Sequence, residues 1–121
     1  MNLLNPNPSI NSPIIVSWWG ASRTKYDFQL DPIGVRYHAR AGVYIFCKLA
    51  PNLRWDAVYV GETNDFSGRI CDDLACHHNW QSIRAAGATH ICTLHVPGDD
   101  ALRLRIETDL RHGLNSPCNR Q

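Results

Sequence analysis

Runs of β-branched and aromatic residues, separated by turn-forming residues, are the clearest pattern in the first half of the chain. Three runs stand out, at residues 14–19, 42–47 and 55–60. Such side chains fit a pleated surface, so each run predicts a β-strand, and a turn with Pro and Asn makes the last two a predicted hairpin. Residues 26–40 show little alternation, so they predict a loop with at most an edge strand.

Helical signals dominate the next part of the chain. Asn64 or Asp65 can cap a helix that begins after Gly61 and runs through Leu74. Residues 80–86 predict a second, shorter helix. The two predicted helices therefore follow the hairpin directly.

One more strand and one longer helix are predicted near the C-terminus. Residues 89–96 alternate in part and are rich in β-branched side chains, which indicates a third core strand. Apolar residues then recur every four positions over residues 101–112, a spacing typical of an amphipathic helix. Gly113 is placed to end this helix.

The order of these core elements is β-β-α-α-β-α. It predicts an α+β fold, with a small, mainly antiparallel sheet of three core strands flanked by helices. We expect residues 41–121 to form this domain and residues 1–40, with their Asn- and Pro-rich start, to form an N-terminal arm with one short strand. A single apolar helical stripe covers one sheet face, so the other face can stay open to a flat polymer.

The composition is typical of a globular protein, with 44% hydrophobic and 19% charged residues. No apolar run approaches the ~20 residues of a membrane span, and the N-terminus lacks the pattern of a signal peptide. The five cysteines are odd in number and scattered, which argues against a disulfide framework. We therefore expect a cytoplasmic protein with no membrane association.

The charge balance restricts how the chain could meet a nucleic acid. The formal net charge is only +1, so any contact with DNA has to be local. Ten of the twelve basic residues are Arg, whose guanidinium can grip a phosphate with two parallel hydrogen bonds.

Hydrolysis of a phosphodiester needs a group that activates water and cations that neutralise the phosphoryl oxygens. Tyr44 and Tyr59 lie on the two predicted hairpin strands, where a suitable register puts both hydroxyls on one face. Arg69 follows on the first predicted helix, and Glu107 lies in the last one. One cation and one carboxylate could thus face the tyrosines.

The same residues carry a resemblance to a known family. Gly42-Val43-Tyr44 and Tyr59-Val60-Gly61 resemble the two-part signature of the GIY-YIG nucleases. The resemblance continues in family order through Gly61 to Phe66, Arg69, Glu107 and Pro117-Cys118-Asn119, and covers residues 41–119. Five elements in the expected order are far more specific than any single tripeptide.

This resemblance implies a divalent-metal-dependent endonuclease that hydrolyses phosphodiester bonds in DNA, or less readily in RNA. Tyr44 and Tyr59 would align or polarise the attacking water, one of them as a phenolate. Arg69 would hold the scissile phosphate, Glu107 would bind one Mg²⁺ or Mn²⁺, and Asn119 would fix the geometry of the site. The resemblance implies no small-molecule cofactor, and it leaves target specificity and oligomeric state open.

The histidine of the family pattern has no simple match. Its usual position, one helical turn after Arg69, is Asp73 in this chain. A continuous helix would carry residue 77 about 12 Å along its axis from Arg69, too far for both to reach one phosphate. We therefore expect the helix to break between Cys71 and Cys76 and to fold His77 or His78 back towards Tyr59.

Ordinary structural roles compete with these assignments. Glu107 could pair with Arg103 and Arg111 on a solvated helix face. Of the arginines, Arg103 is expected to matter far less to activity than Arg69, which matches the phosphate-binding position of the family. Cys71, Cys76 and the two histidines could hold zinc, although their spacing is loose. All four tryptophans are predicted in the core, at positions 18, 19, 55 and 80. A catalytically silent module that binds nucleic acid or a protein partner is the alternative function.

Overall fold

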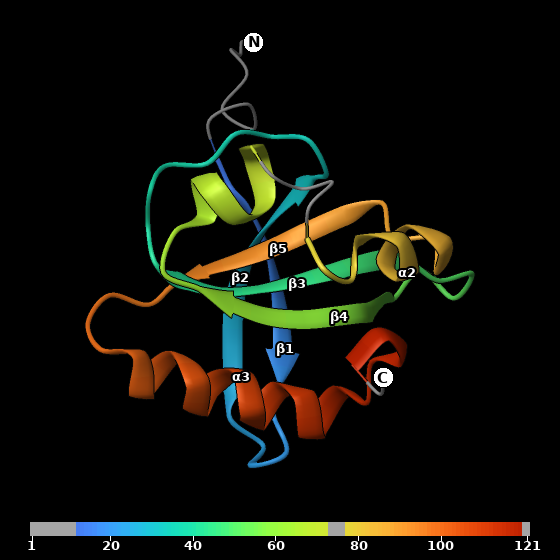
Figure 1. Ribbon diagram of the computed structural model, residues 1–121. Helices are drawn as coiled ribbons and strands as arrows, with labels where there is room; N and C mark the ends of the chain where they lie inside the picture. Colours follow the sequence, from blue (N-terminus) through green and yellow to red (C-terminus); the bar gives the residue numbers. More distant parts are fainter. Residues whose placement is uncertain (1–11, 73–76, 120–121) are drawn as a thin grey trace, which may run out of the picture.

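A five-stranded sheet is the centre of the molecule (Figure 1). The computed structural model describes residues 12–72 and 77–119. The strands are β1 (Ile14–Trp19), β2 (Lys25–Pro32), β3 (Gly42–Leu49), β4 (Trp55–Thr63) and β5 (His90–His95). Neighbouring strands are all antiparallel, in the order β1-β2-β5-β3-β4. β5 therefore lies between two hairpins that precede it in the chain.

The α+β class is confirmed, but the sheet has five strands and not three. The prediction allowed residues 26–40 at most an edge strand, whereas β2 is an inner strand between β1 and β5. Its sequence does alternate, because Tyr26, Phe28 and Leu30 are half-buried or buried while the residues between them are exposed. β1 and β2 pair with each other and β2 pairs with β5, so they belong to the main sheet and not to an arm. Residues 1–11 of the predicted arm lie outside the described part of the chain.

The helical elements are η1 (Ser67–Asp72), α2 (Trp80–Ala85), α3 (Asp100–Leu114) and η3 (Pro117–Asn119). The first predicted helix is a short π-helix, and its expected extension to Leu74 falls outside the described residues. α2 and α3 confirm the other two helices. Gly113 does not end α3, since the left-handed residue at the helix end is Asn115 (φ 50°, ψ 46°). Within the described chain no helix combines the length and the apolar composition needed to cross a bilayer.

Helices cover both faces of the sheet (Figure 1), so the expectation of an open face is wrong. The face next to α3 has a core that includes Phe28, Val43, Ile45, Val60 and Leu110. The opposite core includes Tyr44, Phe46, Tyr59, Ile70 and Ile83, contributed by β3, β4, η1 and α2. Successive residues of β3 point to opposite faces, which explains why a run from Gly42 to Cys47 is buried throughout.

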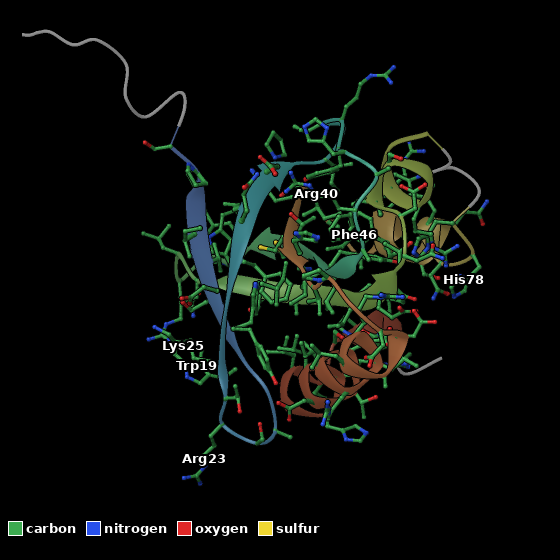
Figure 2. The ribbon with its side chains drawn as sticks, turned by 90° about the vertical axis from the view of Figure 1, so that its left-hand side faces the viewer. Trp19, Arg23, Lys25, Arg40, Phe46 and His78 are labelled. Carbon is green, nitrogen blue, oxygen red and sulfur yellow. The ribbon has the colours of Figure 1, made fainter. Side chains whose placement is uncertain are left out.

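Asp109 attaches the β1–β2 hairpin to α3. Its carboxylate accepts hydrogen bonds from the backbone N–H of Ser22 (2.8 Å), from the Ser22 hydroxyl (2.6 Å) and from the Tyr26 hydroxyl (2.7 Å). These bonds hold the pKa of Asp109 below its usual range. Figure 2 shows the tip of this hairpin, with Trp19 and Arg23, on the opposite side of the molecule from His78.

The tryptophans are only partly in the core. Trp18 is buried, whereas Trp55 and Trp80 are half-buried and Trp19 is 53% exposed. The prediction that all four are core residues is therefore wrong for Trp19. Neighbouring residues of a strand point to opposite faces, so the pair Trp18-Trp19 could not both enter one core.

Gly113 is expected to reverse the usual effect of a Gly-to-Ala change in a helix. Such a change normally stabilises a helix by about 1 kcal/mol. At Gly113 a Cβ atom would lie 2.6 Å from backbone atoms of Ala21 and Gly20, so the hairpin would have to move away from α3. We expect Gly113→Ala to lower the free energy of unfolding in urea by about 1–3 kcal/mol. The exposed Arg105→Ala is the control, and a stabilised Gly113→Ala protein would contradict this packing.

Candidate active site

Tyr44 and Tyr59 lie side by side on the sheet face that η1 and α2 cover. Their ring centroids are 6.2 Å apart. Phe46 is paired directly with Tyr59 and Tyr44 with Gly61, so the register places both tyrosines on one face. A shift in register between Phe46 and Cys47 marks a bulge just beyond this point.

The absence of a side chain at Gly61 leaves the space that the Tyr44 ring occupies. A Cβ atom at Gly61 would lie 2.5 Å from both the Cζ and the Oη atoms of Tyr44. The ring therefore covers the bare backbone of the neighbouring strand, and only glycine leaves room for it. This contact is the physical reason for a glycine two residues after Tyr59.

His77 folds back onto the tyrosine pair, as the sequence predicts. Its Nε2 atom is 2.7 Å from the Tyr44 hydroxyl, and its ring centroid is 5.2 Å from that of Tyr59. The backbone N–H of Asn79 donates to Nδ1 (3.1 Å), so a neutral ring carries its hydrogen on Nε2. That hydrogen points at the Tyr44 oxygen. The described part of η1 ends at Asp72, and residues 73–76 lie outside the described chain.

Burial keeps the imidazole of His77 neutral. The side chain is only 3% exposed, and desolvation lowers its pKa to about 4, with smaller contributions from the charges of Arg69 and His78. His77 is therefore a neutral hydrogen-bond donor to Tyr44 at physiological pH. The hydroxyl hydrogen of Tyr44 is then directed elsewhere.

Arg69 and His78 form the outer layer of the same cluster. The Nη2 atom of Arg69 lies 3.1 Å from Nδ1 of His78, and because a guanidinium can only donate, Nδ1 is the acceptor. The His78 ring is stacked on His77, with centroids 5.1 Å apart and planes 7° apart. Arg69 is only half-buried, so its guanidinium stays accessible from outside.

Opposing effects act on the pKa of the Tyr44 phenol. Its side chain is 1% exposed, and burial raises its pKa above the ordinary value, as does the nearby Tyr59. The guanidinium of Arg69 acts in the opposite direction, and the carboxylate of Glu107 adds to the rise. In the free protein Tyr44 is therefore a protonated phenol.

Glu107 lies near a second carboxylate, that of Glu62. Burial raises the pKa of Glu107, Arg111 lowers it, and the charge of Glu62 raises it again. Glu62 is held by Arg103, whose Nε donates to its Oε1 atom at 3.2 Å. Arg103 is 3% exposed and also donates to Asp100, so it is not the solvated partner of Glu107 that the sequence suggests.

The carboxylates fit a divalent cation of the Mg²⁺ class. Carboxylate oxygens are ligands that suit Mg²⁺ and Mn²⁺, and Glu62 lies near enough to Glu107 for its charge to raise the pKa of that carboxyl. The described residues contain no group of three or more potential ligands. Mg²⁺ commonly takes only one or two carboxylates and completes its shell with water and substrate phosphates. Cys76 of the zinc alternative lies outside the described residues.

Asn119 fixes the backbone of β4 beside Tyr59. Its side-chain oxygen accepts from the N–H of Val60 (2.7 Å), and its amide nitrogen donates to the carbonyl oxygen of the same residue (2.9 Å). The Ser116 hydroxyl also donates to the Asn119 side-chain oxygen. Asn119 thus acts on the site through Val60, while Asn115 ends α3.

The site extends into a cavity of about 340 Å³ next to Arg69. Its walls combine Arg69 and Arg103 with Glu62 and Asp100, and are completed by Thr63, Asn64 and Leu104. Cations and carboxylates thus share one space, and Arg69, which contacts His78, connects this space to the tyrosine cluster. Comparison of the chain with family models, with curated proteins and with solved structures finds no match, so the side chains themselves are what point to a function.

Proposed function

We propose that this protein is a divalent-metal-dependent endonuclease of the GIY-YIG type, which hydrolyses phosphodiester bonds in DNA. One observation carries the proposal: the paired tyrosines, a buried neutral histidine bonded to one of them, and a half-buried arginine form one cluster. Glu107 is close enough for its charge to act on Tyr44. The cluster could thus supply a proton acceptor and a cation for the phosphoryl oxygens, two of the groups that phosphodiester hydrolysis needs.

Tyr44 is the proposed proton acceptor for the attacking water. The oxygen of Tyr44 faces the Nε2 hydrogen of His77 and lies near the charge of Arg69, and both would stabilise a phenolate. Tyr59 packs against His77 and keeps it over Tyr44. Arg69 would grip the scissile phosphate, since its guanidinium is accessible and lines the cavity.

Glu107 would hold the metal ion, with Glu62 beside it. When bound, a divalent ion neutralises charge on the phosphoryl oxygens and lowers the pKa of nearby water. Arg103 forms an ion pair with Glu62, so the negative charge of Glu62 repels a bound phosphate less. The remaining contacts of the site serve to position these groups.

The proposal is tested first by cleavage. Purified protein is incubated with single-stranded, duplex and branched DNA and with RNA, in Mg²⁺, in Mn²⁺ and in EDTA. We expect internal cleavage of DNA that requires the metal. A protein that binds nucleic acid but leaves it intact in both metals would instead be the silent binding module.

The pH dependence provides a more specific prediction. Because burial raises the pKa of Tyr44, only a small fraction is phenolate at neutral pH, and this fraction grows about tenfold per pH unit. The single-turnover cleavage rate is expected to rise with the same slope between about pH 7 and pH 9. Tyr44→Phe should lose both the activity and the slope, whereas Tyr26→Phe, in the distant hairpin, should keep both. An active Tyr44→Phe protein with an unchanged slope would show that Tyr44 is not the base.

A further inference from the structure

A second cavity lies at the C-terminal end of α3. It has a volume of about 440 Å³ and is lined by Thr108, Arg111, His112, Asn115, Ser116 and Asn119. None of these side chains is acidic. Hydroxyl, amide, imidazole and guanidinium groups of this kind are the ones that proteins use to bind phosphate oxygens.

Arg111 is the arginine among the residues that line this cavity. Its side chain is exposed, and within residues 12–72 and 77–119 its guanidinium makes a single hydrogen bond, a long one (3.4 Å) from Nη2 to the backbone oxygen of Asn119. Among the described residues no carboxylate lies within ion-pair distance of Arg111. Arg103 on the same helix differs in both respects, since it is buried and binds two carboxylates. A basic residue in the last helical turn also stabilises α3, but that role needs no cavity.

The second cavity adjoins the proposed catalytic site. Arg111 follows Glu107 by four residues on α3, which is about 6 Å of axial rise on the same side of the helix. Asn119, which lines the cavity, is the residue that binds Val60 next to Tyr59. A turn of helix is comparable with the separation of neighbouring phosphates along one strand. A nucleic-acid strand gripped at the catalytic site would therefore bring another phosphate near Arg111.

We propose that the cavity around Arg111 is a phosphate subsite, which binds the phosphodiester next to the scissile one. The inference rests on the proposed nuclease function, because that function defines the scissile position. Arg111 neutralises the neighbouring phosphate, and the hydroxyl and amide groups of Thr108 and Asn115 supply further hydrogen bonds. The subsite holds the strand in register with the catalytic cluster and acts on binding rather than on the chemical step.

The first test measures binding without cleavage. A fluorescein-labelled DNA duplex is titrated in EDTA at several salt concentrations with wild-type protein, Arg111→Gln and Arg105→Gln. Arg105 is the matched control, since it is an exposed arginine on the same helix outside this cavity. We expect Arg111→Gln to bind about tenfold more weakly, and its salt slope to fall by about 0.9, the value for one lost phosphate contact. Equal affinity and slope for the two variants would overturn the subsite.

A second test locates the phosphate. After wild-type cleavage has been mapped, a neutral methylphosphonate replaces the linkage next to the cleaved one. The change should weaken binding by wild-type protein and by Arg105→Gln, but should have little further effect on Arg111→Gln, because the lost contact is the same. If the methylphosphonate and Arg111→Gln weaken binding additively, they remove different contacts, and the phosphate next to the cleaved one is not bound by Arg111. If wild-type protein neither binds nor cuts DNA, the proposed function fails as well; if it does both and the two arginine variants agree, only the subsite fails.

Discussion

Glu107→Gln is expected to lower metal-dependent cleavage by at least about a thousandfold while leaving the fold intact. The side chain is half-buried and near Glu62, so the amide removes a negative charge that would hold the cation but needs no new space. Loss of the Glu107 charge should change the stability of the protein little, because burial of the carboxylate and its repulsion by Glu62 offset its attraction to Arg111. Single-turnover cleavage and urea unfolding together measure the two effects.

Metal binding distinguishes a ligand from a merely structural carboxylate. Titration with Mn²⁺, followed by electron paramagnetic resonance, should show one bound ion per chain in the wild type and a large loss of affinity in Glu107→Gln. Asp56→Asn, an exposed change on β4, is the control and should bind like the wild type. Two bound ions per chain, or normal cleavage by Glu107→Gln, would refute a single ion held by Glu107.

Arg103→Ala is expected to lower the free energy of unfolding by about 2–3 kcal/mol. The arginine side chain is 4% exposed and neutralises Glu62, which is 27% exposed, so its removal leaves a partly buried carboxylate close to Glu107. Fully buried pairs lose about 3–5 kcal/mol when one partner is removed, and the partial exposure of Glu62 reduces this figure. Urea unfolding of Arg103→Ala and of the exposed Arg105→Ala measures the difference.

The double variant identifies the cause of the instability. If the unpaired charge of Glu62 is responsible, Glu62→Gln should restore part of the stability of Arg103→Ala. A loss in Arg103→Ala no larger than in Arg105→Ala, within about 0.5 kcal/mol, would contradict the buried pair. Arg103 is consequently unsuitable as an inert control for Arg69, although the sequence suggests that use.

Local sequence patterns predict most elements, but they leave out the contacts between them. The apolar runs of β3, β4 and β5 and the four-residue repeat of α3 can each be recognised within one segment. The alternation in β2 is equally local, yet the Asp31-Pro32 pair at the end of the strand and the Gly34 after it make the segment resemble a loop. The end of α3 was misplaced for a different reason. Gly113 is needed for its close approach to the β1–β2 hairpin, and nothing near it in the sequence records that approach.

In the candidate site, too, local sequence predicts some features but not the contacts between distant residues. Pairing of Tyr44 and Tyr59 on one face follows from the hairpin, and the return of His77 follows from a distance argument about helix length. The bond between His77 and Tyr44 and the choice of His77 over His78 depend on how residues 77–79 pack, which spacing does not encode. Arg103 was misjudged because its i,i+4 spacing from Glu107 is a property of the helix alone. Its actual partner, Glu62, lies forty-one residues away.

The place of β5 between two earlier hairpins has a consequence for synthesis on the ribosome. The β1–β2 and β3–β4 hairpins are made of neighbouring residues and can pair as soon as they emerge. Each then presents an open edge, β2 in one and β3 in the other, until residues 90–95 are available to bind both. Open edges pair readily with other chains, so a nascent or truncated chain that stops before β5 is exposed to aggregation. The polar residues Asp27, Gln29 and Asp31 alternate along β2. They disfavour pairing of this edge with other chains until β5 has been synthesised.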